Sequence, residues 1–310
     1  MEETIIYELK SLYRDTFKIR SFTFGEGEES ICIIGSLRGN EVQQTYICSL
    51  LIEKLKEYEK EGKLLKNHKV TVIPSANCFS QNIGKRFWAS DDTDINRMFP
   101  GYSQGETTQR IAEGLFDKIK DYHYGVQLTS FYIPGHFSTH VRMMKTGMED
   151  IEEAKHFGLP YIVVRTPRPY DTTTLNYNWQ IWNCKAYSLY TKACDEIDEK
   201  SAQQACECIL RFLYEKGIVN RPVFGGYRSE VILENQMVSI KSHKAGFLKT
   251  NVEVNDSVKK GEIIAHIYDP YEHKIIEEIK ASHNGTIFFL HAHSLVYAHT
   301  AIAKIKLHQH

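Results

Sequence analysis

The residues from 35 to 41, GSLRGNE, form the first of three polar segments whose residue types could take part in catalysis or binding. They follow the apolar run from Ile31 to Ile34 and precede a stretch with helical spacing. A glycine turn after a buried strand, with a carboxylate at the start of the next helix, is a common position for an active site. Glu41 could bind a metal ion there, whereas Arg38 offers hydrogen-bond donors and no acceptor. If this loop is a metal site, a cation stands where a ligand is expected.

Two further segments contain residues that could bind an anion. They read PSANCFSQNIGKR (residues 74–86) and DTDINRMFPG (residues 92–101). Guanidinium groups bind carboxylates in bidentate fashion, which makes Arg86 and Arg97 candidates for ligand contact together with Asn96. A structural role is the alternative for Asn96 and Arg97, since Asp94 and Arg97 could pair within the loop. The sequence leaves both interpretations open.

Segments typical of strands and helices alternate between about residue 30 and residue 217, and they would position these loops. Apolar residues at helical spacing favour a helix over 41–61. The other elements expected are helices over 106–122, 148–157 and 200–216 and strands over 30–35, 69–74, 125–130, 161–164 and 186–190. Alternation of this kind predicts an α/β sheet with helices on its faces. The connections 77–103 and 165–182 are long, and such loops in a compact domain are usually functional.

From about residue 219 the pattern changes to short β-rich runs separated by turn signals. No helical period is found in this part of the sequence, so we expect a small all-β domain there. We place the boundary near Asn220, because the last helix is expected to have ended by then. The two domains expected are residues 1–219, of the α/β class, and residues 220–310, a β-barrel or sandwich.

Composition excludes several classes of partner. The formal net charge of −1 gives no global electrostatic reason to expect binding to nucleic acid or to an anionic membrane. No apolar run approaches the roughly 20 residues of a transmembrane helix, and the first residues lack the features of a signal peptide. The seven cysteines are odd in number and show no framework spacing, so we expect reduced core residues. A cytoplasmic protein without a nucleic-acid or membrane partner is therefore expected.

The three polar segments together resemble one known family. Residues 92–101 are similar to the D-x-N-R-x-F-P-G signature of the succinylglutamate desuccinylase and aspartoacylase family. Residues 74–86 resemble the P-x-x-N segment and the Gly-x-Arg that precede this signature, and GSLRGNE resembles the family's G-x-x-H-G-N-E loop. The stretch from 244 to 289 resembles the family's lipoyl-like β domain. The resemblance implies a zinc-carboxypeptidase-like fold, in which a mixed α/β sheet flanked by helices precedes a small lipoyl-like all-β domain.

The resemblance also implies a chemistry. Active members of the family are similar to zinc amidohydrolases that remove an acyl group from an N-acyl amino acid. One zinc is held by the His and Glu of H-x-x-E and by the His of a D-x-H-x-S strand, and the Glu of a T-x-E strand acts as general base. Such a zinc keeps one position open for a water molecule and lowers the pKa of that water. By the same resemblance, Arg86, Asn96 and Arg97 would hold substrate oxygens.

The residues at the positions of the family's zinc ligands do not form a zinc site in this sequence. Arg38 stands at the first histidine position and cannot ligate a metal ion, although Glu41 is retained. Leu128 of the strand VQLTS stands at the second histidine position. A shift of the alignment by one residue would place Gln127 or Thr129 there, and neither is a substitute for histidine. We therefore expect the family's zinc to be absent.

The position of the family's general base is also changed. Other residues are candidates for the pocket lining or for a relocated metal site. Tyr190 of AYSLY stands where the family has Glu, and a tyrosine of pKa about 10 is a poor base at neutral pH. Arg142 lies in a segment that resembles the family's P-H-V-R strand, which makes it a candidate for the pocket lining. His123, His136 and His140 lie within eighteen residues and could form a relocated metal site, although their spacing fits no standard pattern.

Two functions follow as hypotheses. The first is a non-catalytic homologue that acts as a partner subunit of an active paralogue, or by self-association, or as a regulator that binds a carboxylate-bearing small molecule. In that case we expect the Arg38 guanidinium to lie against Glu41 and to neutralise it, because an unpaired buried carboxylate is costly. The alternative is a hydrolase of an N-acyl amino acid or related amide that uses an unorthodox metal site or metal-free chemistry.

Overall fold

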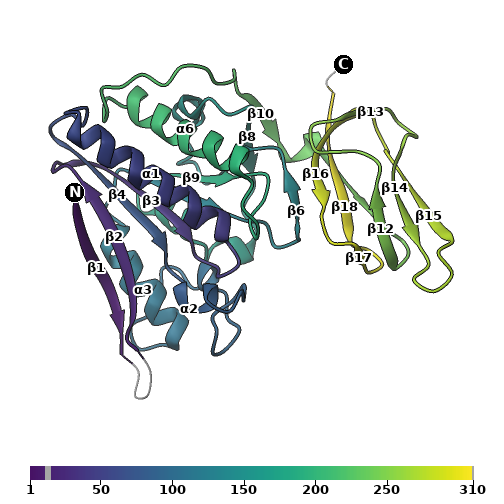
Figure 1. Cartoon of the computed structure of the whole chain (residues 1–310), viewed down its shortest axis with the longest axis horizontal. Helices are drawn as coiled ribbons and strands as arrows, with labels where there is room; N and C mark the ends of the chain where they lie inside the picture. The colour runs from purple at the N-terminus through teal and green to yellow at the C-terminus, as the bar shows by residue number, and fades with distance from the viewer. Residues whose placement is uncertain (11–14, 309–310) are drawn as a thin grey trace. The chain divides into compact units, whose positions relative to one another are not determined.

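The computed structural model describes residues 1–10 and 15–308, and the chain forms two compact units (Figure 1). The first unit contains Met1–Ser130, Thr139–Tyr190 and Cys194–Glu230. The second contains Phe131–Ser138, Thr191–Ala193 and Val231–His310. Two short segments that precede residue 219 thus belong to the second unit, which a single boundary near Asn220 does not include.

The first unit is built on a large mixed sheet. Its strands are β1 (Glu2–Leu9), β2 (Phe17–Phe24), β3 (Glu29–Ser36), β4 (His68–Ser75), β5 (Tyr124–Thr129), β7 (His140–Met144), β8 (Tyr161–Arg165) and β9 (Lys185–Tyr190), and the edge strand β10 (Glu230–Leu233) begins at the last residue of this unit. They lie in the order β1-β2-β4-β3-β5-β9-β7-β8-β10. The central pairs β4/β3, β3/β5 and β5/β9 are parallel. Strands of this kind are covered on both faces, which explains the continuous apolar run from Ile31 to Ile34.

Helices cover both faces of this sheet. The longer ones are α1 (Val42–Lys60), α3 (Thr107–Ile119), α5 (Leu175–Ile181) and α6 (Glu199–Glu215). The ring of Tyr124 in β5 packs on Phe212 of α6, with 5.6 Å between the ring centres. A side chain at the next residue, Gly125, would meet Trp179 of α5 at 2.6 Å. Since successive strand residues face opposite sides of a sheet, α6 and α5 lie on opposite faces.

Short helical segments lie in the connections. They are α2 (Cys78–Gln81), α4 (Ile151–Ala154), η1 (Ile95–Arg97), η2 (Lys155–Phe157) and η3 (Pro169–Asp171). The helix expected over 148–157 begins only at Ile151, because the carboxylate of Asp150 accepts a hydrogen bond from the Glu153 N–H (3.0 Å) and caps it. No helix in the described part of the chain is long and apolar enough to cross a membrane.

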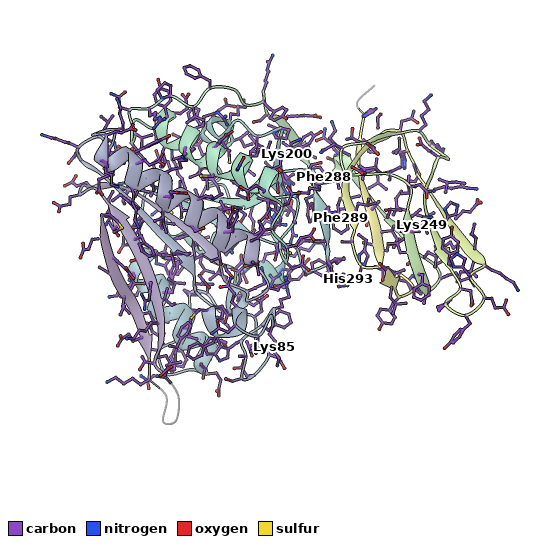
Figure 2. The ribbon with its side chains drawn as sticks, in the orientation of Figure 1. Lys85, Lys200, Lys249, Phe288, Phe289 and His293 are labelled. Carbon is purple, nitrogen blue, oxygen red and sulfur yellow. The ribbon has the colours of Figure 1, made fainter. Side chains whose placement is uncertain are left out.

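The second unit is all-β, as expected from the sequence. Its strands are β6 (Gly135–Phe137), β11 (Met237–Lys241), β12 (Gly246–Thr250), β13 (Ser257–Val258), β14 (Ile263–Tyr268), β15 (Ile275–Lys280), β16 (Gly285–His291), β17 (Leu295–Val296) and β18 (Ala301–Leu307), with η4 (Glu234–Gln236) between β10 and β11. They form two sheets, β11-β18-β16-β13 with β6 added to β16, and β15-β14-β12-β17. Phe289 of β16, labelled in Figure 2, packs on Phe137 of β6 with 4.7 Å between ring centres. This contact fixes the early segment 131–138 within the second unit.

Candidate functional site

The carboxylate of Glu41, at the start of α1, is fully buried and fully hydrogen-bonded. Its Oε2 accepts from the backbone N–H groups of Leu37 (3.1 Å) and Arg38 (3.0 Å). Its Oε1 accepts from the N–H (3.1 Å) and the hydroxyl (2.6 Å) of Ser130 and from Arg38 Nη1 (3.2 Å). Five donors therefore surround two oxygens, and the relative exposure of the residue is 0%.

Arg38 lies between two carboxylates. Its Nη1 pairs with Glu41, as the sequence predicted. Its Nε donates to both oxygens of Asp94 (3.1 and 3.0 Å), and its Nη2 donates to Asp94 Oδ2 (3.0 Å). Burial opposes the charged form of Arg38, but the Asp94 and Glu41 carboxylates outweigh this effect and raise its pKa. The guanidinium is a permanent cation at this position.

These residues do not fit the zinc that the resemblance implies. Every oxygen lone pair of Glu41 that could face a metal ion already accepts a hydrogen bond, and Arg38 presents donors only. Leu128 is a fully buried side chain of β5, opposite Leu189 of β9. Among residues 1–10 and 15–308, no group of three or more His, Cys, Asp or Glu side chains is arranged to hold a metal ion.

Arg86 lies beside this network. Its Nη1 donates to the Ser130 hydroxyl (3.2 Å), the same hydroxyl that donates to Glu41. Burial lowers the pKa of Arg86, and the neighbouring charge of Arg38 lowers it further. In the part of the chain that the structure describes, no ion pair joins Arg86 to a carboxylate. Arg86 is therefore a cation that a bound anion would stabilise.

Asn96 and Arg97 have protein partners. The Asn96 carbonyl oxygen accepts from the backbone N–H of Leu175 (3.1 Å), which connects η1 to the start of α5. Arg97 Nη1 donates to the backbone carbonyl of Tyr170 (2.5 Å) and lies 3.6 Å from Asp171. The side-chain pair between Asp94 and Arg97, which the sequence left open as one alternative, is not the arrangement found: the Asp94 carboxylate binds Arg38, whereas Arg97 extends to Asp171 in η3. Ligand contact by Asn96 and Arg97 stays a prediction.

Tyr190 ends β9 and is almost completely buried. Its ring stacks on the imidazole of His140 at 4.8 Å, with an angle of 6° between the planes. The Arg142 guanidinium lies 4.4 Å from the centre of the Tyr190 ring. Burial lowers the pKa of Arg142. The structure thus brings the candidate pocket residue Arg142 together with the residue at the general-base position.

The three histidines considered for a relocated metal site are distributed over different places. The Nδ1 of His123 lies 3.3 Å from Ser30, at the start of β3, whereas Glu41 follows the end of that strand. His140 stacks on Tyr190. His136 belongs to β6 in the second unit. Within the described ranges they do not form a metal-binding group.

Asp94 and Ser130 belong to the network around Arg38 and Glu41, although the sequence analysis did not predict these contacts. Asp94 lies inside the signature DTDINRMFPG, so its carboxylate could be noted from the sequence. Its partner Arg38 is 56 residues away, so the sequence could not predict the contact between them. Ser130 is the last residue of VQLTS, where only the preceding positions were considered as ligands. Ser130 directly follows β5, which is parallel to its neighbour β3. This position was the signal that could have placed Ser130 beside the loop that follows β3.

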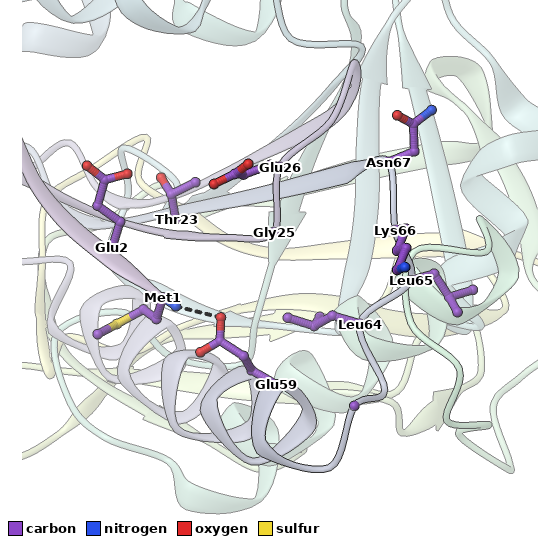
Figure 3. A pocket seen from close by; sticks show the side chains of 11 residues that line it. Met1, Glu2, Thr23, Gly25, Glu26, Glu59, Leu64, Leu65, Lys66 and Asn67 are labelled. Carbon is purple, nitrogen blue, oxygen red and sulfur yellow. Dashed lines mark hydrogen bonds and ion pairs between the residues drawn. The ribbon is translucent and has the colours of Figure 1, made fainter.

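A pocket lies elsewhere in the first unit (Figure 3). Its volume is about 710 Å³, and its lining includes Glu2, Glu26, Glu59 and Lys66. The terminal ammonium of Met1 donates to Glu59 at 2.5 Å, as the dashed line in Figure 3 marks. Glu59 is near the last turn of the 19-residue helix α1, whereas Glu41 precedes its first turn, so the two ends are separated by about 28 Å at 1.5 Å per residue.

Comparisons with known proteins agree with this architecture. Residues 28–174 match the family model of the succinylglutamate desuccinylase/aspartoacylase catalytic domain. A curated relative, the N-alpha-acetyl-L-2,4-diaminobutyric acid deacetylase of Halomonas elongata, is 24% identical over 260 residues, which cover 79% of this chain and 72% of the relative.

Solved structures share the fold at low sequence identity. A succinylglutamate desuccinylase from Silicibacter sp. TM1040 matches with a TM-score of 0.84 and 15% identity over 99% of this chain and 94% of the other. The product-bound ectoine utilization protein EutE from Ruegeria pomeroyi matches with a TM-score of 0.79 and 15% identity, over 94% and 90% of the two chains. The fold expected from the sequence is thereby confirmed.

Proposed function

Because the chain belongs to the succinylglutamate desuccinylase/aspartoacylase family of N-acyl-amino-acid amidohydrolase-like proteins, we propose that it is a non-catalytic member of that family. We propose further that it acts in the cytoplasm, either as a partner subunit of an active paralogue or as a regulator that binds a small molecule. A hydrolase has to activate a water molecule and polarise an amide carbonyl. The proposal rests on the residues that occupy the positions for these two tasks.

The observation that supports the proposal is the ion-pair network of Arg38 with Glu41 and Asp94. In the family mechanism a zinc ion would supply the positive charge beside Glu41. In this chain a guanidinium supplies that charge, and it neutralises two carboxylates through four hydrogen bonds of 3.0 to 3.2 Å. A guanidinium has no empty orbital for water or for a carbonyl oxygen, so it can fix charges but cannot act as a Lewis acid.

The base position gives further support. Tyr190 lies against His140 and Arg142, and it occupies the position at the end of β9 where the resemblance places the family's Glu. A phenol keeps its proton at neutral pH, so it does not accept one from water. What the site retains is positive charge, in Arg86 and Arg142. That combination is suited to holding an anion without transforming it.

Metal content and hydrolytic activity test the proposal. The full chain, expressed alone and extensively desalted, would be examined by elemental analysis and then assayed with N-alpha-acetyl-L-2,4-diaminobutyrate, N-acetyl-L-aspartate and N-succinyl-L-glutamate. We expect far less than one zinc per chain and no hydrolysis above the buffer blank, with or without added zinc. Stoichiometric zinc together with hydrolysis that a chelator abolishes would contradict the proposal and would favour the alternative of an enzyme with an unorthodox metal site.

A further inference from the structure

Two histidines with one residue between them lie at the end of strand β16, in the second unit. His291 is the last residue of β16, and His293 follows it after Ala292. Residues two apart along an extended chain carry their side chains on the same side. The structure agrees, because the centres of the two imidazole rings are 5.9 Å apart and the ring planes meet at 81°. Two imidazoles are therefore held next to each other.

The ring of His291 is buried among aromatic side chains. In the pairing of β16 with β6, Phe289 is the register partner of Phe137, and His291 is the partner of Gly135. Because alternate strand residues share a face, His291 lies on the face that carries the packed rings of Phe289 and Phe137. Its relative exposure is 7%. Burial favours the neutral imidazole, which is the form that binds a metal ion.

One nitrogen of the His291 ring is buried without a partner. No hydrogen-bond partner for Nδ1 is found in the part of the chain that the structure describes. Buried polar atoms nearly always have a partner, in the protein, in ordered water or in an ion, so this atom requires an explanation. His293, labelled in Figure 2, is exposed to solvent. The pair thus offers an inner ligand that lacks a partner and an outer ligand past which a metal ion can enter.

The spacing of the two rings suits one metal ion. A metal–nitrogen bond of about 2.0–2.1 Å places each ring centre about 3.2 Å from the metal, so two rings at a tetrahedral angle have their centres about 5 Å apart. The observed distance is 5.9 Å. Rotation of the exposed His293 side chain can close this difference, since exposed side chains change rotamer readily. Among the residues that the structure describes, no third His, Cys, Asp or Glu side chain joins the pair, so water would complete the coordination.

We propose that His291 and His293 form a site for a late first-row divalent metal ion, bound through Nδ1 of His291 and a ring nitrogen of His293. Imidazole suits Cu²⁺, Ni²⁺ and Zn²⁺, whereas Mg²⁺ and Ca²⁺ prefer oxygen ligands. By the general order of affinities, Cu²⁺ binds more tightly than Zn²⁺. The inference goes beyond the proposed function, because the site lies in the second unit and uses none of the residues around Arg38 and Glu41.

Calorimetric titration of the metal-free full chain tests the site. His308 and His310 have the same spacing in the sequence. The titrations therefore use a reference chain, the full chain with the replacements His308→Gln and His310→Gln. The probes are Zn²⁺, Cu²⁺ in the presence of glycine as a competing chelator, and Mg²⁺. We expect one Zn²⁺ or one Cu²⁺ to bind per reference chain, Cu²⁺ more tightly, and no binding of Mg²⁺.

Single replacements within the pair identify the ligands. His291→Gln and His293→Gln, each introduced into the reference chain, should weaken Zn²⁺ binding at least about tenfold, because a chelate is reduced to one imidazole. His283→Gln, which changes an exposed histidine of the same unit, should leave binding unchanged. In electron paramagnetic resonance spectra of the Cu²⁺ complex, the reference chain should show coupling to two imidazole nitrogens. His293→Gln should show coupling to one.

The replacement of His293 keeps the proposal falsifiable, because an exposed side chain can be changed without loss of the fold. Equal affinities of the reference chain and of His293→Gln for Zn²⁺ would overturn the proposal. So would the absence of Cu²⁺ binding by a reference chain whose circular dichroism shows it to be folded. Two neutral ligands hold a metal ion reversibly, so extensive desalting should empty this site. Zinc that remains after desalting and supports hydrolysis would therefore contradict the proposed function and not this inference.

Discussion

At the residue scale, Arg38 supplies a positive charge beside the buried carboxylate of Glu41, and the proposed function assigns to this guanidinium the place of a metal ion. A buried Glu41 needs a neighbouring positive charge, and a guanidinium three residues earlier can supply it. This pair could be predicted from the sequence, because both residues lie in one loop and their chemistry leaves few alternatives. The second partner, Asp94, could not, because only the folded sheet brings η1 beside the GSLRGNE loop.

Removal of Arg38 should destabilise the protein strongly. Arg38→Ala leaves the buried Glu41 and the half-buried Asp94 without their shared ion-pair partner, and breaking a buried pair from one side costs about 3–5 kcal/mol. Urea unfolding followed by circular dichroism measures this loss. The matched control is Arg20→Ala, which removes an exposed ion pair with Glu3 and should change little. Equal midpoints for the two variants would show that the Arg38 network has no special energetic role.

A buried histidine of the second unit should make stability depend on pH. Burial, and then the neighbouring His293, lower the pKa of His291 from 6.5 to about 4. Between these values the unfolded chain binds more protons than the folded one, so stability present above pH 6.5 is lost as the pH falls toward 4. The loss should reach up to about 3 kcal/mol, at 1.36 kcal/mol for each pKa unit.

Urea midpoints at pH 7 and pH 4.5 measure this effect of His291. His291→Gln should show a smaller fall in the free energy of unfolding between the two pH values than the wild type. His283→Gln changes an exposed histidine of the same unit and should follow the wild type. If His291→Gln and the wild type lose the same free energy, another group causes the acid sensitivity.

At the scale of elements, the parallel strands at the centre of the sheet were the part of the fold that the local sequence could predict. Strands β3, β4, β5 and β9 appear as continuous apolar runs because both of their faces are buried. The hairpin of β1 and β2 was not expected, because β1 exposes much of its length and its apolar residues follow no clear period. Strand β7 was indicated only by the resemblance to the family's P-H-V-R strand, because His140 and Arg142 interrupt its apolar pattern; in the structure both side chains pack against the ring of Tyr190.

Helix α5 is a second element that the local sequence could not define. Helix α5 has only seven residues, and three of its buried side chains are the amides Asn176, Asn178 and Gln180. Such a segment has no amphipathic period that could identify it as helical. Its position over β5 and β9 is set by tertiary contacts, among them the Trp179 N–H that donates to the backbone carbonyl of Ile119 (2.9 Å). The arrangement of these buried amides is therefore determined by tertiary packing, and no sequence motif indicates it.

At the scale of the whole molecule, the chain crosses between its two units more than once. A change of composition near residue 219 is a local signal, so it can indicate only one boundary. The pairing of β6 with β16 joins residues about 150 positions apart, and nothing in the sequence around Gly135 records it. Gly135 is required at this place, because a side chain there would meet the Phe289 ring at 2.2 Å and the Leu290 carbonyl at 2.6 Å.

This connectivity predicts that the two units cannot be separated by one cut. A fragment that ends at Glu230 would keep the segment 131–138 but lose β16, and the rings of Phe131 and Phe137 would lose their contact with Phe289. Apolar side chains left in this way promote aggregation. We therefore expect the fragment to elute as aggregate in size-exclusion chromatography, whereas the full chain elutes as a defined species. Replacing Phe131 and Phe137 by Ser in the fragment should increase its soluble fraction several-fold, because the exposed apolar area is then reduced. A fragment that is soluble without these replacements would mean that β6 does not depend on β16, and that the boundary near residue 219 describes an independent domain after all.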